Sequence, residues 1–253
     1  MQHPPATVAE AGAKITALTG IERKPTQVRQ FLKRLGMAPR KVAAIPAKAD
    51  VQAQQEFKTQ TLEPKLEEAK RGQRAVYFID ASHFVLAPFL GIVWCFARLF
   101  IKAPAGRQRF NVLGALHAIS KEVVTVTNDT YITAQQVCEL LETLAALNSN
   151  LPLSVVLDNA RYQRCALVIE RARQLNIELL FLPGYSPNLN LIERFWKYVK
   201  KECLYSRYYP NFAEFKQAIS SCIAEAQHKN QAKLQSLLSL RFQVFEANVG
   251  VAA

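Results

Sequence analysis

The stretch SVVLDNARYQRCALVIERARQLNIELLFLPGYSP, residues 154–187, holds two short apolar runs separated by an amphipathic segment. Residues 154–157 and 177–182 have the aliphatic and β-branched composition of buried strands, and residues 164–174 have the spacing of a helix. A strand, a helix and a second strand in this order predict a parallel pair joined by a crossover helix. The turn formers at 183–187 predict a loop at the end of the second strand.

The sequence on either side extends this unit into a larger α/β domain. Apolar runs bounded by turn formers predict further strands at residues 75–79, 91–101, 109–118 and 122–127. Helical periodicity is found at residues 133–147, 191–204 and 212–227. Neighbouring strands followed by alternating helices and strands predict a mixed sheet that is covered by helices on both faces.

The N-terminal region predicts a small helical unit. Residues 6–19 read as a helix that ends at Gly20, and a second helix follows Pro25, with Thr26 as its cap. Arg29 and Lys33 lie on the polar face of the second helix and are candidate DNA contacts. Two short helices, the second of them basic, are typical of a helix-turn-helix, and the basic segment that follows could form a wing.

Composition and charge narrow the class of protein. The 253 residues are 50% hydrophobic and 21% charged, which is typical of a globular chain, and the net charge of +12 favours a polyanionic partner. The most apolar stretch, residues 84–101, is interrupted by Arg98 and predicts a buried strand or hairpin rather than a membrane span, and no secretory signal precedes it. None of the five cysteines forms a CxxC pair, which argues against a zinc site or a disulfide framework and favours a reducing cytoplasm.

Three carboxylates stand at positions where α/β proteins place ligands. Asp80 and Asp158 each follow a predicted strand, and the carboxyl ends of strands form the rim of such a sheet. Glu193 stands at the start of a predicted helix. A structural alternative exists for each: either Asp could only cap the turn that follows it, and with Asn190 as N-cap, Glu193 would be a capping-box residue.

Together these carboxylates predict a metal site. Hard divalent ions such as Mg²⁺ prefer carboxylate oxygens, and two such ions about 4 Å apart can cleave a phosphodiester. Lys197 and Lys200 share a helix face with Glu193, at steps of four and three, and could contact DNA beside the site. Arg107 and Arg109, in a basic turn, are further candidates for phosphate contacts, although such turns are often basic only for solubility.

Three motifs resemble one family. VVLDNARYQ at 155–163, LPGYSPNLNLIERFWKYVKKE at 182–202 and AVYFIDASHF at 75–84 are similar to the catalytic signature of the mariner superfamily of transposases, and most of all to its bacterial insertion-sequence branch. The 34 residues between Asp158 and Glu193 are a spacing characteristic of that family.

The resemblance implies an RNase H-like fold and cut-and-paste movement of a DNA element, usually into a TA dinucleotide. It implies that Asp80, Asp158 and Glu193 bind Mg²⁺ or Mn²⁺, two ions in all. Its implied partners are duplex DNA at the element ends and the target, bound by a homodimer in the bacterial cytoplasm at the nucleoid. The implied division is a partial, winged-helix-like helix-turn-helix region at 1–46, a linker helix at 47–72 and the catalytic domain at 73–253.

Two features depart from the family pattern. Gln163 stands where many relatives carry a histidine, so a supporting role at that position is in doubt. The chain also begins inside the DNA-binding region of full-length relatives, as expected of a truncated copy or of one reading frame of a split gene.

Three alternatives stay open at this stage. One is a nuclease or integrase of the same fold that cuts DNA without moving an element, which a strand-transfer assay would separate from a transposase. Another is a DNA-binding derivative that has lost catalysis, which the intact set of acids disfavours. The last is a basic globular protein without a nucleic-acid role.

Overall fold

The computed structural model describes most of the chain in two compact units. The described residues are 4–39, 48–87, 95–97, 100, 108–205, 207–229 and 231–244. One unit comprises Met1–Ala47 with Phe245–Ala253, and the other comprises Lys48–Val244. Most of the strand predicted at 91–101, the core of the basic wing at 40–47, and Arg107 fall outside the described residues.

The first unit is the predicted helix pair, α1 (Val8–Thr19) and α2 (Pro25–Arg34). The N-cap of α2 is Lys24 with Pro25 in the first turn, so the expected cap at Thr26 is wrong: Thr26 is already helical. The physical reason is that Pro25 has its φ fixed for a helix and needs no N–H there.

The helices of this pair meet through small side chains. Ala11 of α1 and Val28 of α2 are buried, at 3% and 2% exposure. Arg29 and Lys33 are exposed on α2, as their polar face predicted. Their side chains are therefore available to a ligand.

The second unit is built on a mixed sheet of five described strands. They are β1 (Ala75–Val85), β2 (Arg109–His117), β3 (Val123–Asn128), β4 (Leu153–Leu157) and β5 (Ile177–Phe181). The order is β3-β2-β1-β4-β5; β1, β2 and β3 pair antiparallel, while β4 is parallel to both β1 and β5. The predicted fold class is confirmed.

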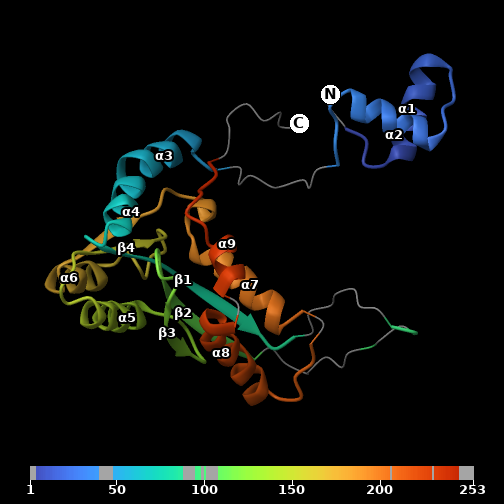
Figure 1. Ribbon diagram of the computed structural model, residues 1–253. Helices are drawn as coiled ribbons and strands as arrows, with labels where there is room; N and C mark the ends of the chain where they lie inside the picture. The colour runs from blue at the N-terminus through green and yellow to red at the C-terminus, as the bar shows by residue number, and fades with distance from the viewer. Residues whose placement is uncertain are drawn as a thin grey trace. The chain divides into compact units, whose positions relative to one another are not determined.

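Helices cover both faces of this sheet (Figure 1). One face carries α5 (Ala134–Leu147) and α6 (Ala166–Gln174), and the other carries α7 (Ile192–Cys203), α8 (Phe212–Lys229) and α9 (Gln231–Leu237). Strand residues alternate between the two cores, as a pleated strand requires: Tyr77 and Ile79 belong to the first, Val76 and Phe78 to the second. No helix in the described part of the chain is long and apolar enough to cross a bilayer.

Strand β1 is longer than the sequence predicted. It was expected to end before Asp80, but it continues to Val85, because its pairing with β2 runs on through Asp80↔Gly114 to Val85↔Arg109. Its parallel pairing with β4 stops at Phe78. Beyond that point, among the described strands, β1 pairs only with β2.

The predicted linker is a helical run that packs within the second unit. It consists of α3 (Val51–Glu56), a π-helical segment (Phe57–Leu62) and α4 (Glu63–Lys70). The π-helical segment ends two residues before Pro64, which has no N–H to continue the α-helical ladder. The side chains of Leu62, Leu66 and Ala69 are buried in the core that α7 also enters.

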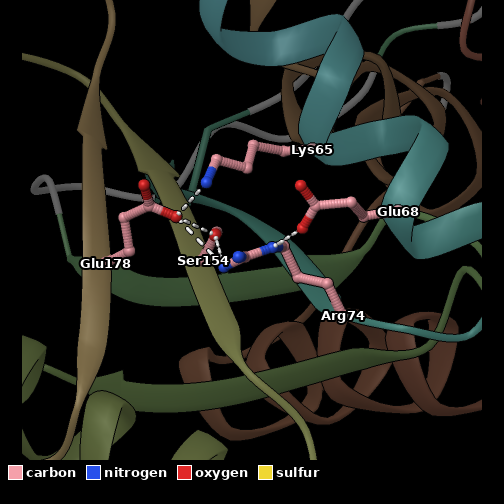
Figure 2. Close-up of polar contacts among 5 residues, drawn as sticks. All are labelled: Lys65, Glu68, Arg74, Ser154 and Glu178. Atoms are coloured by element: carbon pink, nitrogen blue, oxygen red, sulfur yellow. Dashed lines mark hydrogen bonds and ion pairs between the residues drawn. The ribbon is translucent and has the colours of Figure 1, made fainter.

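A polar cluster fastens the end of this run to the sheet (Figure 2). The Arg74 guanidinium donates to Glu68 of α4 at 2.5 Å, to Ser154 Oγ of β4 at 2.8 Å and to Glu178 of β5 at 3.1 Å. The Lys65 ammonium lies 3.0 Å from the same Glu178 oxygen. These five side chains are called the anchor cluster below; they lie where β4 and β5 begin.

Candidate active site

The strand register brings the two predicted aspartates together. In the parallel pair, Phe78 of β1 lies opposite Val156 of β4. Asp80 and Asp158 each follow two residues later, so the same register places them side by side and on the same face of the sheet. This is the face that α7 covers, since Phe78 and Val156 both belong to that core.

Asp158 also has the turn role considered from the sequence. Its Oδ1 accepts a hydrogen bond from the Ala160 N–H at 3.0 Å. The next side chain, Asn159, donates from Nδ2 to the carbonyl of Leu182, which ties this turn to the loop after β5. The cap and a role in binding are compatible, because a carboxylate has two oxygens and several acceptor positions.

Glu193 also lies near these aspartates, but the start of its helix is not held by the N-cap that was expected. Asn190 is not the N-cap of α7; the cap is Leu191, and it makes no side-chain hydrogen bond. The capping-box interpretation of Glu193 is therefore wrong. The Asn190 side chain is instead buried and donates to the Ile79 carbonyl of β1 at 3.1 Å, one residue before Asp80. A buried side-chain bond thus holds the start of α7 against the strand that carries the first acid.

A glycine on the neighbouring strand lets α7 approach the sheet. Gly114 pairs with Asp80, and a Cβ placed on it would lie 2.7 Å from the Trp196 ring and 3.0 Å from Ile192. Both contacts are shorter than van der Waals distance, so any larger residue would push α7 outward. Glycine at this position therefore keeps Glu193 close to Asp80.

The three carboxylates line one cavity of about 340 Å³. The rest of its wall comes from the turn after β4 and from the loop between β5 and α7: Asn159, Ala160, Leu182, Pro183, Gly184, Tyr185, Ser186, Pro187 and Asn190. Burial and then the charge of Glu193 raise the pKa of Asp80 to about 7, with a further contribution from Asp158. The three acids thus share one cavity, and their charges oppose one another.

Tyr162 lies beside the acids, although no role was predicted for it. Burial raises the pKa of its phenol to about 12, and the charges of Asp158 and Asp80 act in the same direction. Its oxygen accepts a hydrogen bond from Gln163 Nε2 at 3.3 Å. Its place in the VVLDNARYQ motif, four residues after Asp158, was the one available signal.

The donor set fits hard divalent cations. Three carboxylates supply oxygen ligands and an excess of negative charge, which Mg²⁺ or Mn²⁺ would neutralise. Within the described ranges, no three His, Cys, Asp or Glu side chains gather closely enough to hold a metal ion. The acids repel one another, since the charges of Glu193 and Asp158 both raise the pKa of Asp80.

The basic residues predicted to contact DNA differ in their surroundings. Lys200 is half-buried close to the acids, and its charge lowers the pKa of Asp80; its ammonium also lies 5.7 Å from the centre of the Phe84 ring. Lys197 and Arg109 are exposed. Of Lys197 and Lys200, both on α7, Lys200 is therefore the one whose charge acts on the acids.

Comparison with known families identifies the second unit. Residues 75–216, more than half of the chain, match the family described as DDE superfamily endonuclease. The chain belongs to this family. Residues 6–61 of this endonuclease match a second family, described as winged helix-turn-helix, and no significant match was found among curated protein sequences.

Solved structures share the fold of this DDE endonuclease. A Mos1 mariner paired-end complex with Mn has a TM-score of 0.61 at 16% identity, with 96% of this chain and 82% of that chain covered. The Mos1 strand transfer complex has a TM-score of 0.59 at 16% identity, with coverage of 96% and 81%. At such identities the likeness establishes the RNase H-like fold.

Proposed function

We propose that this DDE endonuclease is a transposase that cleaves and joins DNA with Asp80, Asp158 and Glu193. One observation carries the proposal: β1, β4 and α7 present these three carboxylates to one cavity. We also assign the chain to the bacterial insertion-sequence branch of the mariner superfamily, an assignment that the motifs carrying these acids support.

Each acid would hold metal from a different element. Asp80 and Asp158, adjacent in register, would bind two divalent ions, Mg²⁺ or Mn²⁺, and Glu193 would complete the ligand set from α7. When bound, the ions supply charge that stabilises the attacked phosphate and lowers the pKa of bound water. The chain itself contributes the fixed spacing of the acids and a wall that limits water, while Lys200 contributes positive charge beside them.

The remaining chain would bring DNA to this site. The surplus of +12 attracts the phosphate backbone, and we assign end recognition to residues 1–46, with Arg29 and Lys33 of α2 as contacts. We assign the connection to residues 47–72 and catalysis to residues 73–253. Mos1 transposase forms a paired-end complex with its left transposon end, and a homodimer of this chain would likewise hold two element ends.

A plasmid assay tests the proposal. The protein is incubated with Mg²⁺ and a supercoiled plasmid that carries the DNA flanking its coding sequence on both sides. We expect nicks at the element ends followed by joined products, and neither with Asp158→Asn. Nicks without joining would make the protein a nuclease, and binding without nicks would make it an inactive DNA-binding derivative; either result overturns the proposal.

A further inference from the structure

The cavity that holds the acids depends on a residue outside the matched DDE region. Gln54 of α3 is completely buried, although its side chain is an amide. Its Nε2 donates to the Tyr185 carbonyl at 3.4 Å, and its Oε1 accepts from Asn188 Nδ2 at 3.0 Å. A buried amide is stable only when its polar atoms are paired, so these bonds fix where the loop lies against α3.

The loop that Gln54 holds is a wall of the acid cavity. Gly184, Tyr185, Ser186 and Pro187 line it, and the same stretch leads into Glu193. Tyr185 has φ of 57°, a left-handed conformation that is unfavourable for a residue with a side chain. Such a conformation persists only when its surroundings hold it, and the Gln54 amide binds the carbonyl of this residue.

Asn188, the other residue that Gln54 contacts, is held from two sides. Its Nδ2 also donates to the Gln243 carbonyl at 2.8 Å. Both α3 and the segment after α9 therefore form hydrogen bonds with the loop. At the far end of the same helical run, the anchor cluster fastens α4 to the strands where β4 and β5 begin. The helical run is thus fixed at Gln54 and at Glu68, 14 residues apart, which is about 20 Å at 1.5 Å per residue.

We propose that Gln54 is a positioning residue for the acid site: it sets the loop that presents Glu193 toward Asp80 and Asp158. This inference rests on the proposed function, in which those acids bind metal. Gln54 belongs to the stretch matched to the winged helix-turn-helix family, yet it packs inside the catalytic unit. The assembly of the site therefore requires a residue of the region before the catalytic domain.

The test compares two glutamines of one helix. Gln54→Leu removes both hydrogen bonds, while Gln55→Leu makes the same chemical change at an exposed neighbour. Gln54→Glu keeps the acceptor for Asn188 but buries an acid whose oxygen faces the Tyr185 carbonyl, so its effects should be in the same direction and at least as large. Three properties are measured: backbone hydrogen exchange of residues 183–190 without metal, the Mn²⁺ concentration that half-maximally raises the melting temperature, and the rate of plasmid nicking.

We expect Gln54→Leu to speed exchange in the loop by roughly tenfold, because losing a buried hydrogen bond costs about as much as one decade in an equilibrium. The Mn²⁺ midpoint should rise and the nicking rate should fall, each by roughly tenfold, while Gln55→Leu matches wild type. Wild-type loop exchange and Mn²⁺ midpoint in Gln54→Leu would overturn the inference. So would exchange that accelerates equally throughout residues 48–244, since it would show a general loss of stability.

The inference and the proposed function fail in different ways. If the wild-type protein does not nick DNA while loop exchange and the Mn²⁺ midpoint depend on Gln54, the positioning role stands and the transposase assignment falls. If the wild-type protein nicks and joins DNA and Gln54→Leu does both at the same rate, the transposase assignment stands and Gln54 has no positioning role.

Discussion

The carboxylates at the two ends of strands β4 and β5 have opposite electrostatic surroundings. Where these strands begin, burial alone would raise the pKa of Glu178, but hydrogen bonds from Ser154 and Lys65 and the charges of Lys65 and Arg74 lower it. Where they end, burial and the charges of Glu193 and Asp158 raise the pKa of Asp80 to about 7. The anchor cluster carries its own cations, whereas the charge of Lys200 beside the acid cavity only partly offsets the negative charge there.

This difference separates a structural polar site from a functional one. A carboxylate that already has a guanidinium and an ammonium beside it has little to gain from a ligand, and its effect is to hold α4 on the sheet. Carboxylates that repel one another destabilise the chain until a cation arrives, so their arrangement is explained by binding rather than by stability. The sharpest tests apply the same chemical change at both ends.

The largest expected effect comes from matched Glu→Gln substitutions. Glu193→Gln removes an anionic ligand and should lower the plasmid nicking rate by about 100-fold or more, since metal charge stabilisation contributes several kcal/mol. Glu178→Gln, in the anchor cluster, should nick within about threefold of wild type. If Glu193→Gln nicks like wild type and melts at a lower temperature, Glu193 has a structural role and the two ends are not functionally different.

The second test concerns pH and the metal-free protein. Because the folded-state pKa of Asp80 is raised, the folded chain retains a proton that the unfolded chain loses, and stability falls as pH rises from about 4 to about 7. Asp80→Asn should therefore stabilise the metal-free protein at pH 8 by about 2 to 4 kcal/mol, and by almost nothing at pH 3. Urea unfolding at both pH values measures this; a benefit independent of pH would show that the charge of Asp80 is not its source.

A smaller effect on stability is expected in the anchor cluster, where the carboxylates have cations beside them. Arg74→Met leaves Glu68 and Glu178 without their shared cation and should lower the free energy of unfolding by about 1 to 2 kcal/mol at pH 7. The pKa of Glu178 is lowered in the folded state, so its contribution is present above pH 4.5 and is lost as pH falls below that value. Arg173→Met, at an exposed ion pair, is the matched control and should leave the melting curve unchanged. If both variants melt at the same temperature at pH 7, the anchor cluster does not stabilise the protein.

The smallest expected effect is on DNA binding by α2, which belongs to neither end of strands β4 and β5. The double substitution Arg29→Ala, Lys33→Ala should weaken duplex DNA binding several-fold and reduce the slope of log K against log salt by about 2, one for each lost phosphate contact. Glu178→Gln should bind DNA like wild type. Titrations at several salt concentrations decide this, and an unchanged slope in the double variant would exclude α2 as a source of the DNA contacts.

The sequence by itself determined the elements and the chemistry. Apolar runs predicted β4 and β5, helical spacing predicted α5, α6 and α7, and carboxylates after strands predicted an acidic site at the rim of the sheet. These patterns succeed because burial of one face imposes a period on the sequence, which can be read locally. The region of the acids and the fold class followed from such local information.

Only the tertiary structure decided how the site is assembled. Strand register sets Asp80 beside Asp158, and no local pattern encodes which residues of two distant strands pair. The bond from Asn190 to the Ile79 carbonyl, the contact of Trp196 with Gly114 and the grip of Gln54 on the loop all join residues more than 80 positions apart. Asn190 was predicted to be a cap because its sequence context favours one; packing against β1 gave its amide a buried carbonyl instead, and an unpaired carbonyl there would cost more than a missing cap.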